Sequence, residues 1–156
     1  MKNHNIGSVS TATMREQDLL PRFAEELLRQ KPCRRVHRSL ACKILRRVNK
    51  CIDGRFGEAD EYFASEDAGW DLEALTDALQ EYAPAYFYFG SHPGDGADFG
   101  FWLSESFEED FDGLRVSDLC EVPAGYSGEV LLVNDHGNMS LYAYSRGRGR
   151  ELWGIV

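Results

Sequence analysis

The sequence predicts an α+β fold in which about three N-terminal helices pack on one face of a roughly five-stranded antiparallel sheet. Two observations support this prediction. Before Pro84 the apolar residues recur at helical spacing, whereas beyond Pro84 short aromatic or β-branched runs are separated by Gly, Pro, Asn and Asp. A group of helices followed by a meander of strands is typical of α+β proteins.

The length favours one domain, because 156 residues can bury a sizeable core but are few for two ordinary domains. We expect a single domain over residues 13–156, with a basic helical part (13–55) and an acidic part that holds the sheet (56–156). Residues 1–12 are small and polar, with little to bury, and are expected to form a flexible tail.

The first expected helix follows Thr13 and Glu16, which are spaced as in a capping box. Pro21 would kink a helix that began at Thr13 but fits the first turn of one that begins near Asp18, so the later start is favoured.

The second expected helix, residues 34–52, is amphipathic and basic. The spacing predicts that its apolar face carries Val36, Leu40, Ile44, Val48 and Ile52. The other face carries seven cations: Arg34, Arg35, Arg38, Lys43, Arg46, Arg47 and Lys50. A third helix is expected over residues 71–82, ahead of Pro84.

Five strands are expected beyond Pro84, in the segments AYFYFG, FGFWLS, EVLLVND, NMSLYAYS and RELWGIV. The first two are joined by a turn at Pro93-Gly94, and the third and fourth by a turn over residues 135–138. The link over residues 105–128 is expected to hold a short acidic helix.

The glycine-rich turn is not a nucleotide-binding loop, because Gly94, Gly96 and Gly100 miss the G-x-G-x-x-G spacing and lead into a strand. A metal site is an alternative if the two hairpin tips meet at one end of a shared sheet. Its ligands would be His92, Asp95, Asp98, Asp135 and His136.

No cofactor is expected, and the four cysteines include no C-x-x-C pair that would indicate a metal site. A hydrolase is not indicated either, since no catalytic-serine or catalytic-cysteine signature is present. The absence of an apolar run near the roughly 20 residues that cross a bilayer predicts a cytoplasmic protein, without membrane contact.

Charge is divided unevenly along the chain, whose net charge is −9. Residues 1–55 hold 13 Lys and Arg against 5 Asp and Glu, whereas residues 56–156 hold 4 against 21. The acidic part is densest in ESFEEDFDG, which carries Glu105, Glu108, Glu109, Asp110 and Asp112.

Two segments, FYFGSHPGDGADFGFW and VPAGYSGEVLLVNDHGNMSLYAY, resemble a family of small uncharacterised proteins of phages, prophages and plasmids, over roughly residues 72–156. The motifs HPGDGADFGFW and VNDHGNMSLY mark the family but carry no assigned chemistry. The resemblance implies an accessory protein of a mobile element, and many such proteins block host defences by binding.

Three functions remain open. The leading hypothesis is a non-enzymatic inhibitor of an anti-restriction or anti-CRISPR type, acting in the host cell. Its acidic residues would compete with nucleic acid for a basic protein such as a nuclease. An alternative is a nucleic-acid-binding regulator that uses Arg34, Arg35, Arg38, Arg46 and Arg47. The second alternative is the metal-dependent enzyme described above.

Overall fold

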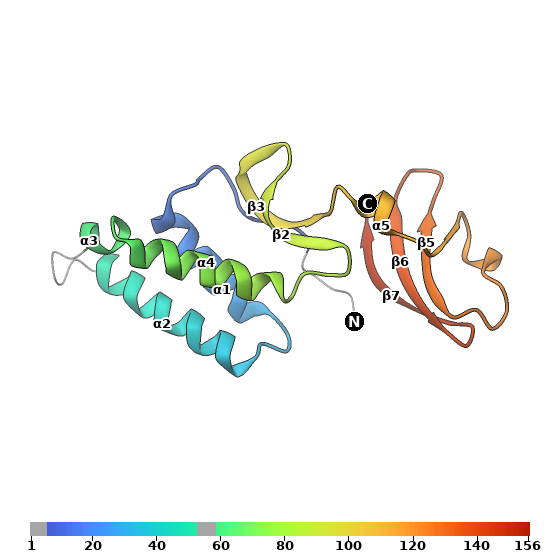
Figure 1. The fold of residues 1–156 in the computed structure, drawn as a ribbon, viewed down its shortest axis with the longest axis horizontal. Helices are drawn as coiled ribbons and strands as arrows, with labels where there is room; N and C mark the ends of the chain where they lie inside the picture. Colours follow the sequence, from blue (N-terminus) through green and yellow to red (C-terminus); the bar gives the residue numbers. More distant parts are fainter. Residues whose placement is uncertain (1–5, 53–58) are drawn as a thin grey trace. The chain divides into compact units, whose positions relative to one another are not determined.

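The computed structural model describes residues 6–52 and 59–156 (Figure 1). These residues form two compact units. The N-terminal unit contains residues 6–83 and 87–102, and the C-terminal unit contains residues 84–86 and 103–156. The α+β class is as predicted.

The N-terminal unit is built around three longer helices, seen side by side in Figure 1. They are α1 (Glu16–Arg29), α2 (Arg35–Ile52) and α4 (Glu66–Gln80), and α1 packs against both of the others. A short helix, α3 (Ala59–Phe63), precedes α4 and was not predicted. Helix α1 begins two residues before the expected start, and Thr13 donates a hydrogen bond of 2.7 Å to Asp18 beside its first turn.

The buried face of α2 differs from the predicted one. Val36 and Ile52 are 66% and 68% exposed, and the face that packs in the core carries His37, Ala41, Ile44, Val48 and Cys51. Residues spaced strictly four apart drift by about 40° at each step. Positions 36 and 52 therefore lie about 160° apart on the helix and cannot share one buried face.

A three-stranded sheet completes the N-terminal unit, in the order β1 (Gly7–Ser10), β3 (Asp95–Leu103), β2 (Phe87–His92). Strand β1 lies within the segment expected to be a tail. Phe23 of α1 packs edge-on against Phe89 and Phe99, with ring centroids 4.9 and 5.7 Å apart. These aromatic contacts join the first helix to the sheet.

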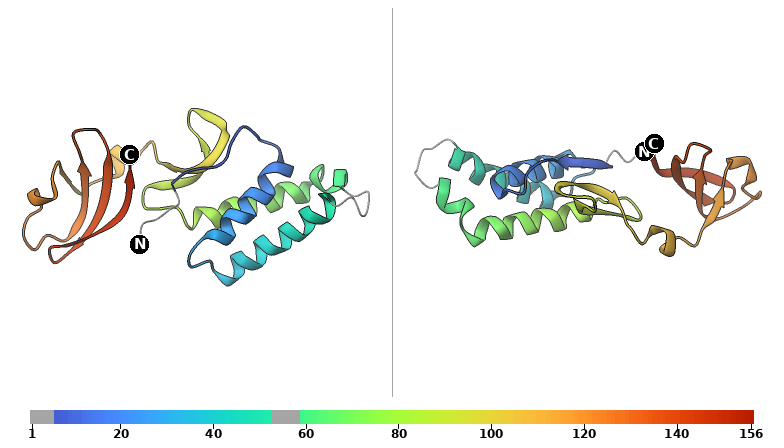
Figure 2. Two further views of the ribbon diagram at one scale, coloured as in Figure 1. Left: turned by 180° about the vertical axis from the view of Figure 1, so that it is seen from behind. Right: turned by 90° about the horizontal axis from the view of Figure 1, so that it is seen from above.

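The C-terminal unit contains a four-stranded sheet, drawn in orange to red in Figure 2. Its order is β4 (Leu114–Val116), β5 (Gly128–Val133), β6 (Met139–Ser145), β7 (Arg148–Ile155). β4 runs parallel to β5, and the connection between them includes a 3₁₀ turn, η1 (Leu119–Glu121).

The predicted acidic helix, α5 (Phe107–Asp110), packs against Trp153 of that sheet. Phe107 and Phe111 are buried, and the Phe107 ring lies 5.8 Å from that of Trp153. The Trp153 indole N–H donates to the carbonyl oxygen of Ala85 at 2.9 Å, which holds residues 84–86 in this unit.

The single five-stranded sheet was therefore a wrong prediction: the strands form separate sheets of three and four. All five predicted strand segments are strands, and β1 and β4 join them. Alternation of apolar residues identifies a strand but not its partner. Here each sheet packs in its own aromatic cluster. Phe23 contacts the three-stranded sheet through Phe89, and Phe107 contacts the four-stranded sheet through Trp153.

Both predicted hairpin turns are present. Residues 93–94 join β2 to β3, and residues 134–138 join β5 to β6, where Gly137 has a φ of +80°. Among the described residues, no helix is long and apolar enough to span a membrane.

Candidate nucleic-acid interface

One face of α2 presents a row of cations to solvent. We call this row the α2 stripe; it consists of Arg35, Arg38, Lys43, Arg46 and Lys50, all exposed. On a helix that turns about 100° per residue, these positions fall within an arc of about 140°. The helix contains no Asp or Glu. None of the five forms an ion pair or side-chain hydrogen bond with another described residue.

Two other arginines of the predicted nucleic-acid-binding set form ion pairs with acids of α4 or just after it. Arg34 forms an ion pair with Glu81, and Arg47 Nη1 lies 2.6 Å from Asp71 Oδ2. Sequence reasoning grouped them with Arg35, Arg38 and Arg46 because it could not place α4. The structure divides the basic residues into a pair that holds α4 and a stripe that faces solvent.

Asp71 gathers donors from two elements. The Tyr62 hydroxyl donates to its carboxylate at 2.9 Å, and the Arg47 guanidinium lies 5.2 Å from the centre of the Tyr62 ring. Burial and the hydrogen bond to Asp71 both raise the pKa of the Tyr62 hydroxyl, although Arg47 opposes the shift. Arg47 therefore has two structural partners, Asp71 and Tyr62.

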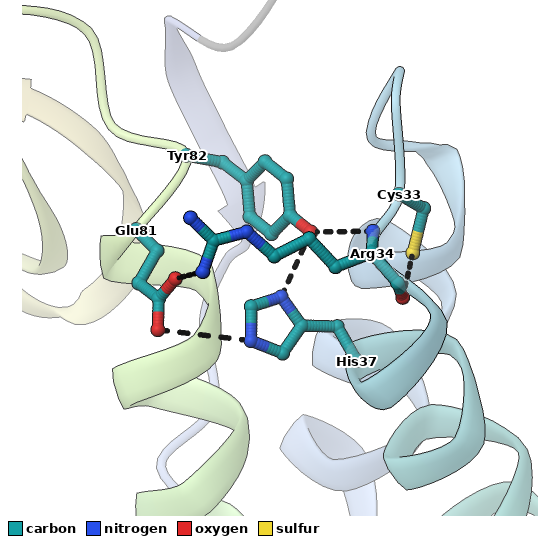
Figure 3. A network of polar contacts seen from close by, with 5 residues as sticks. All are labelled: Cys33, Arg34, His37, Glu81 and Tyr82. Atoms are coloured by element: carbon teal, nitrogen blue, oxygen red, sulfur yellow. Dashed lines mark hydrogen bonds and ion pairs between the residues drawn. The ribbon is translucent and has the colours of Figure 1, made fainter.

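A polar network joins the start of α2 to the end of α4 (Figure 3). The Tyr82 hydroxyl accepts the Arg34 N–H at 3.0 Å and lies 2.8 Å from His37 Nδ1. His37 Nε2 is 3.7 Å from Glu81, and the His37 side chain is nearly buried. Sequence reasoning missed this network because His37 falls within an otherwise cationic run. Its effect is to fix the orientation of α2, and hence of the stripe.

The predicted protein-binding residues lie in α5 and directly beside it. Glu105, Glu108, Glu109, Asp110 and Asp112 are all exposed. Glu108 Oε2 lies 2.7 Å from Arg115 Nη2, and Asp110 accepts a hydrogen bond of 2.5 Å from the Ser106 hydroxyl. The buried rings of Phe107 and Phe111 anchor the segment that carries these acids.

The residues of the proposed metal alternative lie in two different units. His92, Asp95 and Asp98 belong to the β2–β3 hairpin, and Asp135 and His136 to the β5–β6 turn. The shared sheet that would bring the tips together is not formed, since β3 pairs with β1 and β2, and β5 with β4 and β6. Within the described ranges, no group of three His, Cys, Asp or Glu residues could hold a metal ion.

The hairpin residues have local contacts instead. Asp95 Oδ1 accepts the N–H of Ala97 at 3.0 Å, and His92 Nδ1 accepts that of Gly94 at 3.0 Å. The His92 ring packs edge-on against Trp102, with centroids 4.6 Å apart. Asp98 accepts a hydrogen bond of 2.9 Å from Ser8 on β1.

Comparisons of the chain with family models, curated proteins and solved structures found no match.

Proposed function

We propose that this protein binds duplex nucleic acid through its phosphates, with the α2 stripe as the contact surface. The observation that supports the proposal is the division of the basic residues. Arg34 and Arg47 are satisfied by acids of α4 and its end, whereas the five cations of the stripe have no such partner among the described residues. A helix that served only to balance nearby acids would direct its cations toward them.

The dimensions of the stripe suit a phosphate backbone. From Arg35 to Lys50 the helix rises about 22 Å, at about 1.5 Å per residue. Duplex DNA carries one negative charge per roughly 1.7 Å of its axis, so several phosphates lie within that length. Contacts to phosphates position a protein on a duplex but do not read its sequence, so we expect binding without sequence preference. The resemblance to proteins of phages and plasmids agrees with an accessory role on the nucleic acid of a mobile element.

The test is a titration of a labelled duplex at several salt concentrations. Five phosphate contacts predict that log K falls with log salt with a slope of about −4.5. The variant R35Q/R38Q/R46Q should weaken binding and make the slope shallower by about 3.

The matched control is R15Q/R22Q/R29Q, which removes the same charge from α1 and the residue just before it. It should keep most of the affinity. Absence of duplex binding by the wild-type chain, or equal loss in the two variants, would remove the stripe as a binding surface.

A second candidate is the inhibitor expected from the acidic segment, binding a basic nucleic-acid-binding protein such as a nuclease. The specific observation in its favour is the anchoring of α5 by Phe107 and Phe111, which are 2% and 7% exposed. The acids are thereby held on an ordered segment, so that less conformational entropy is lost on binding.

Charge reversal at Glu105, Glu109 and Asp112 should abolish inhibition of a target nuclease while leaving the melting temperature within a few degrees of the wild type. These three were chosen because no ion pair or side-chain hydrogen bond is formed by them among the described residues. Full inhibition by the reversed protein would reject this candidate.

A further inference from the structure

The β6–β7 hairpin carries three arginines, one in its turn and two at the start of β7, in an otherwise acidic unit. Arg146, Arg148 and Arg150 are exposed, and their side chains have no ion-pair or hydrogen-bond partner within the described part of the chain. From Phe56 to Ser145 the chain has only one Lys or Arg, Arg115, against 20 Asp and Glu. The cations are thus concentrated at one hairpin tip.

Backbone conformation does not explain the choice of arginine at this tip. Arg146 and Gly147 have φ angles of +51° and +77°, as the central residues of a type I′ turn require. Asn, Asp and Gly adopt this conformation far more readily than Arg. A residue held there against its preference is an outlier of the kind found at binding sites.

The tip is also held in place by the preceding loop. The N–H of Gly147 donates to the Tyr126 carbonyl at 2.9 Å, and the N–H of Arg146 donates to the Ser127 hydroxyl at 2.9 Å. A Cβ on Gly147 would come within 3.0 Å of the Gly125 nitrogen. Arg146 therefore extends from an ordered turn, and Arg148 and Arg150 extend from the strand that follows it.

Two tyrosines lie beside this turn, Tyr144 on β6 and Tyr126 in the loop before β5, with their ring planes inclined at 65° to each other. Tyr144 pairs with Gly128 on one side and Gly149 on the other. A Cβ on Gly149 would lie 2.6 Å from the Tyr144 ring, so this glycine is needed for the ring to rest over β7. The Tyr126 ring covers Gly128, and its centroid is 6.3 Å from that of Tyr144. Both rings are only half-buried.

We propose that this tip is a second nucleic-acid site, specific for single strands. The bases would stack on Tyr144 and Tyr126, and Arg146 would contact a phosphate at the turn. Strand alternation places Arg148 and Arg150 on the opposite face from Tyr144. Because β7 is an edge strand, a nucleic-acid strand that crosses this edge of the sheet would then contact Arg148 and Arg150.

Single-stranded nucleic acid fits these groups better than an acidic peptide does. Exposed bases offer a π-face for each tyrosine, and Arg-rich segments combined with aromatic rings are a common means of binding single strands without sequence preference. The carboxylates of an acidic peptide would pair with the arginines but would make no stacking contact with the two tyrosine rings. The site is independent of the duplex-binding function proposed for α2, because it lies in the other unit.

The experiment measures binding of a labelled oligo(dT) and oligo(U) to the full chain by fluorescence anisotropy. R146Q/R148Q/R150Q should weaken binding at least tenfold and reduce the salt slope by about 2, at about 0.7 per phosphate on a single strand. Y144L should weaken it about tenfold, since one stacked base loses its aromatic partner. Y144F keeps the ring and should bind like the wild type.

R35Q/R38Q/R46Q is the matched control, because it removes the same charge from the N-terminal unit. It should retain oligonucleotide binding and weaken duplex binding, so that failure of one proposal can be distinguished from failure of the other. The single-strand proposal is overturned if the wild type does not bind, if both triple variants lose oligonucleotide binding equally, or if Y144F behaves like Y144L. It is also overturned if the turn variant changes only self-association, measured by light scattering, because the tip would then contact another copy of the chain.

Discussion

Gly100 allows β1 to approach β3 closely. A Cβ added at this position would lie 2.1 Å from the Gly7 carbonyl oxygen, which is backbone and cannot move independently of β1. We expect Gly100→Ala to reduce the free energy of unfolding by about 1–3 kcal/mol through overpacking. Denaturant unfolding measures the effect.

Gly96 provides the control in the same strand, because a Cβ there would meet nothing within 4 Å and its φ is not in the left-handed region. Gly96→Ala should leave stability unchanged or raise it slightly. Equal stability of the two variants would show that β1 does not depend on the close approach.

Tyr86 should affect stability at high pH. Its hydroxyl donates to Glu129 at 2.5 Å, and this hydrogen bond, with a smaller effect of burial, raises the pKa of Tyr86 from 10.0 to about 12. A raised folded-state pKa means that the stabilising effect is complete below about pH 10 and is lost as the pH rises toward about 12.

Glu129→Gln removes the charged acceptor and should lower the pKa of Tyr86, as followed by tyrosinate absorbance. Between pH 10 and 12 the wild type should lose more unfolding free energy than Tyr86→Phe does. Parallel pH profiles for the two proteins would contradict the assignment.

At the scale of elements, the connection between α2 and α4 depends on Tyr82. Its hydroxyl contacts the Arg34 N–H and His37 together, so Tyr82→Phe leaves two polar groups without this partner. We expect a loss of about 1–2 kcal/mol in the free energy of unfolding. Ser39→Ala, at an exposed position of the same helix, should have little effect. Unchanged thermal unfolding of Tyr82→Phe would show that the network is not structural.

Local sequence signals predicted many of these elements correctly. The turns at Pro93-Gly94 and near Gly137 were recognised because the residues that permit tight reversals lie between apolar runs. Strand β1 was missed because GSVS is small and polar, and it is ordered by pairing with a strand about 90 residues away. No local pattern reports such a distant partner.

The site was predictable only in part, for a related reason. Periodicity placed seven cations on the outer part of α2, but it could not distinguish Arg34 and Arg47 from the α2 stripe. That distinction depends on Glu81 and Asp71, which belong to a different region of the sequence. Arg146, Arg148 and Arg150 were not considered as a site because the net charge of residues 56–156 is strongly negative.

At the scale of the whole molecule, neither unit is continuous in sequence. Within the described residues the chain passes between the units after Ala83, Tyr86 and Trp102. Unfolding of the C-terminal unit would release residues 84–86, which Trp153 holds through Ala85, and so disturb the junction between α4 and β2. We therefore predict one cooperative unfolding transition.

Calorimetry tests this prediction with one substitution in each unit. Phe101 and Trp153 are 1% and 2% exposed, and replacing either with Ala should cost about 3–5 kcal/mol. Both variants should shift the same single transition, with equal calorimetric and van't Hoff enthalpies. Trp102→Ala should cost less than Phe101→Ala because Trp102 is only half-buried. Two separate transitions, each sensitive to one substitution, would show independent domains.

The pairing of β1 with β3 also has a consequence for biosynthesis. Gly7 faces Phe101 in the sheet, so the ribosome makes the first strand long before its partner. At about 5–20 residues per second, the delay is on the order of 10 s. During that time helices α1, α2 and α4 can form and pack from local sequence, whereas β1 has no strand to pair with. A chain that ends before Phe99 would therefore lack every residue that pairs with β1, and its N-terminal segment would stay open to proteases and chaperones.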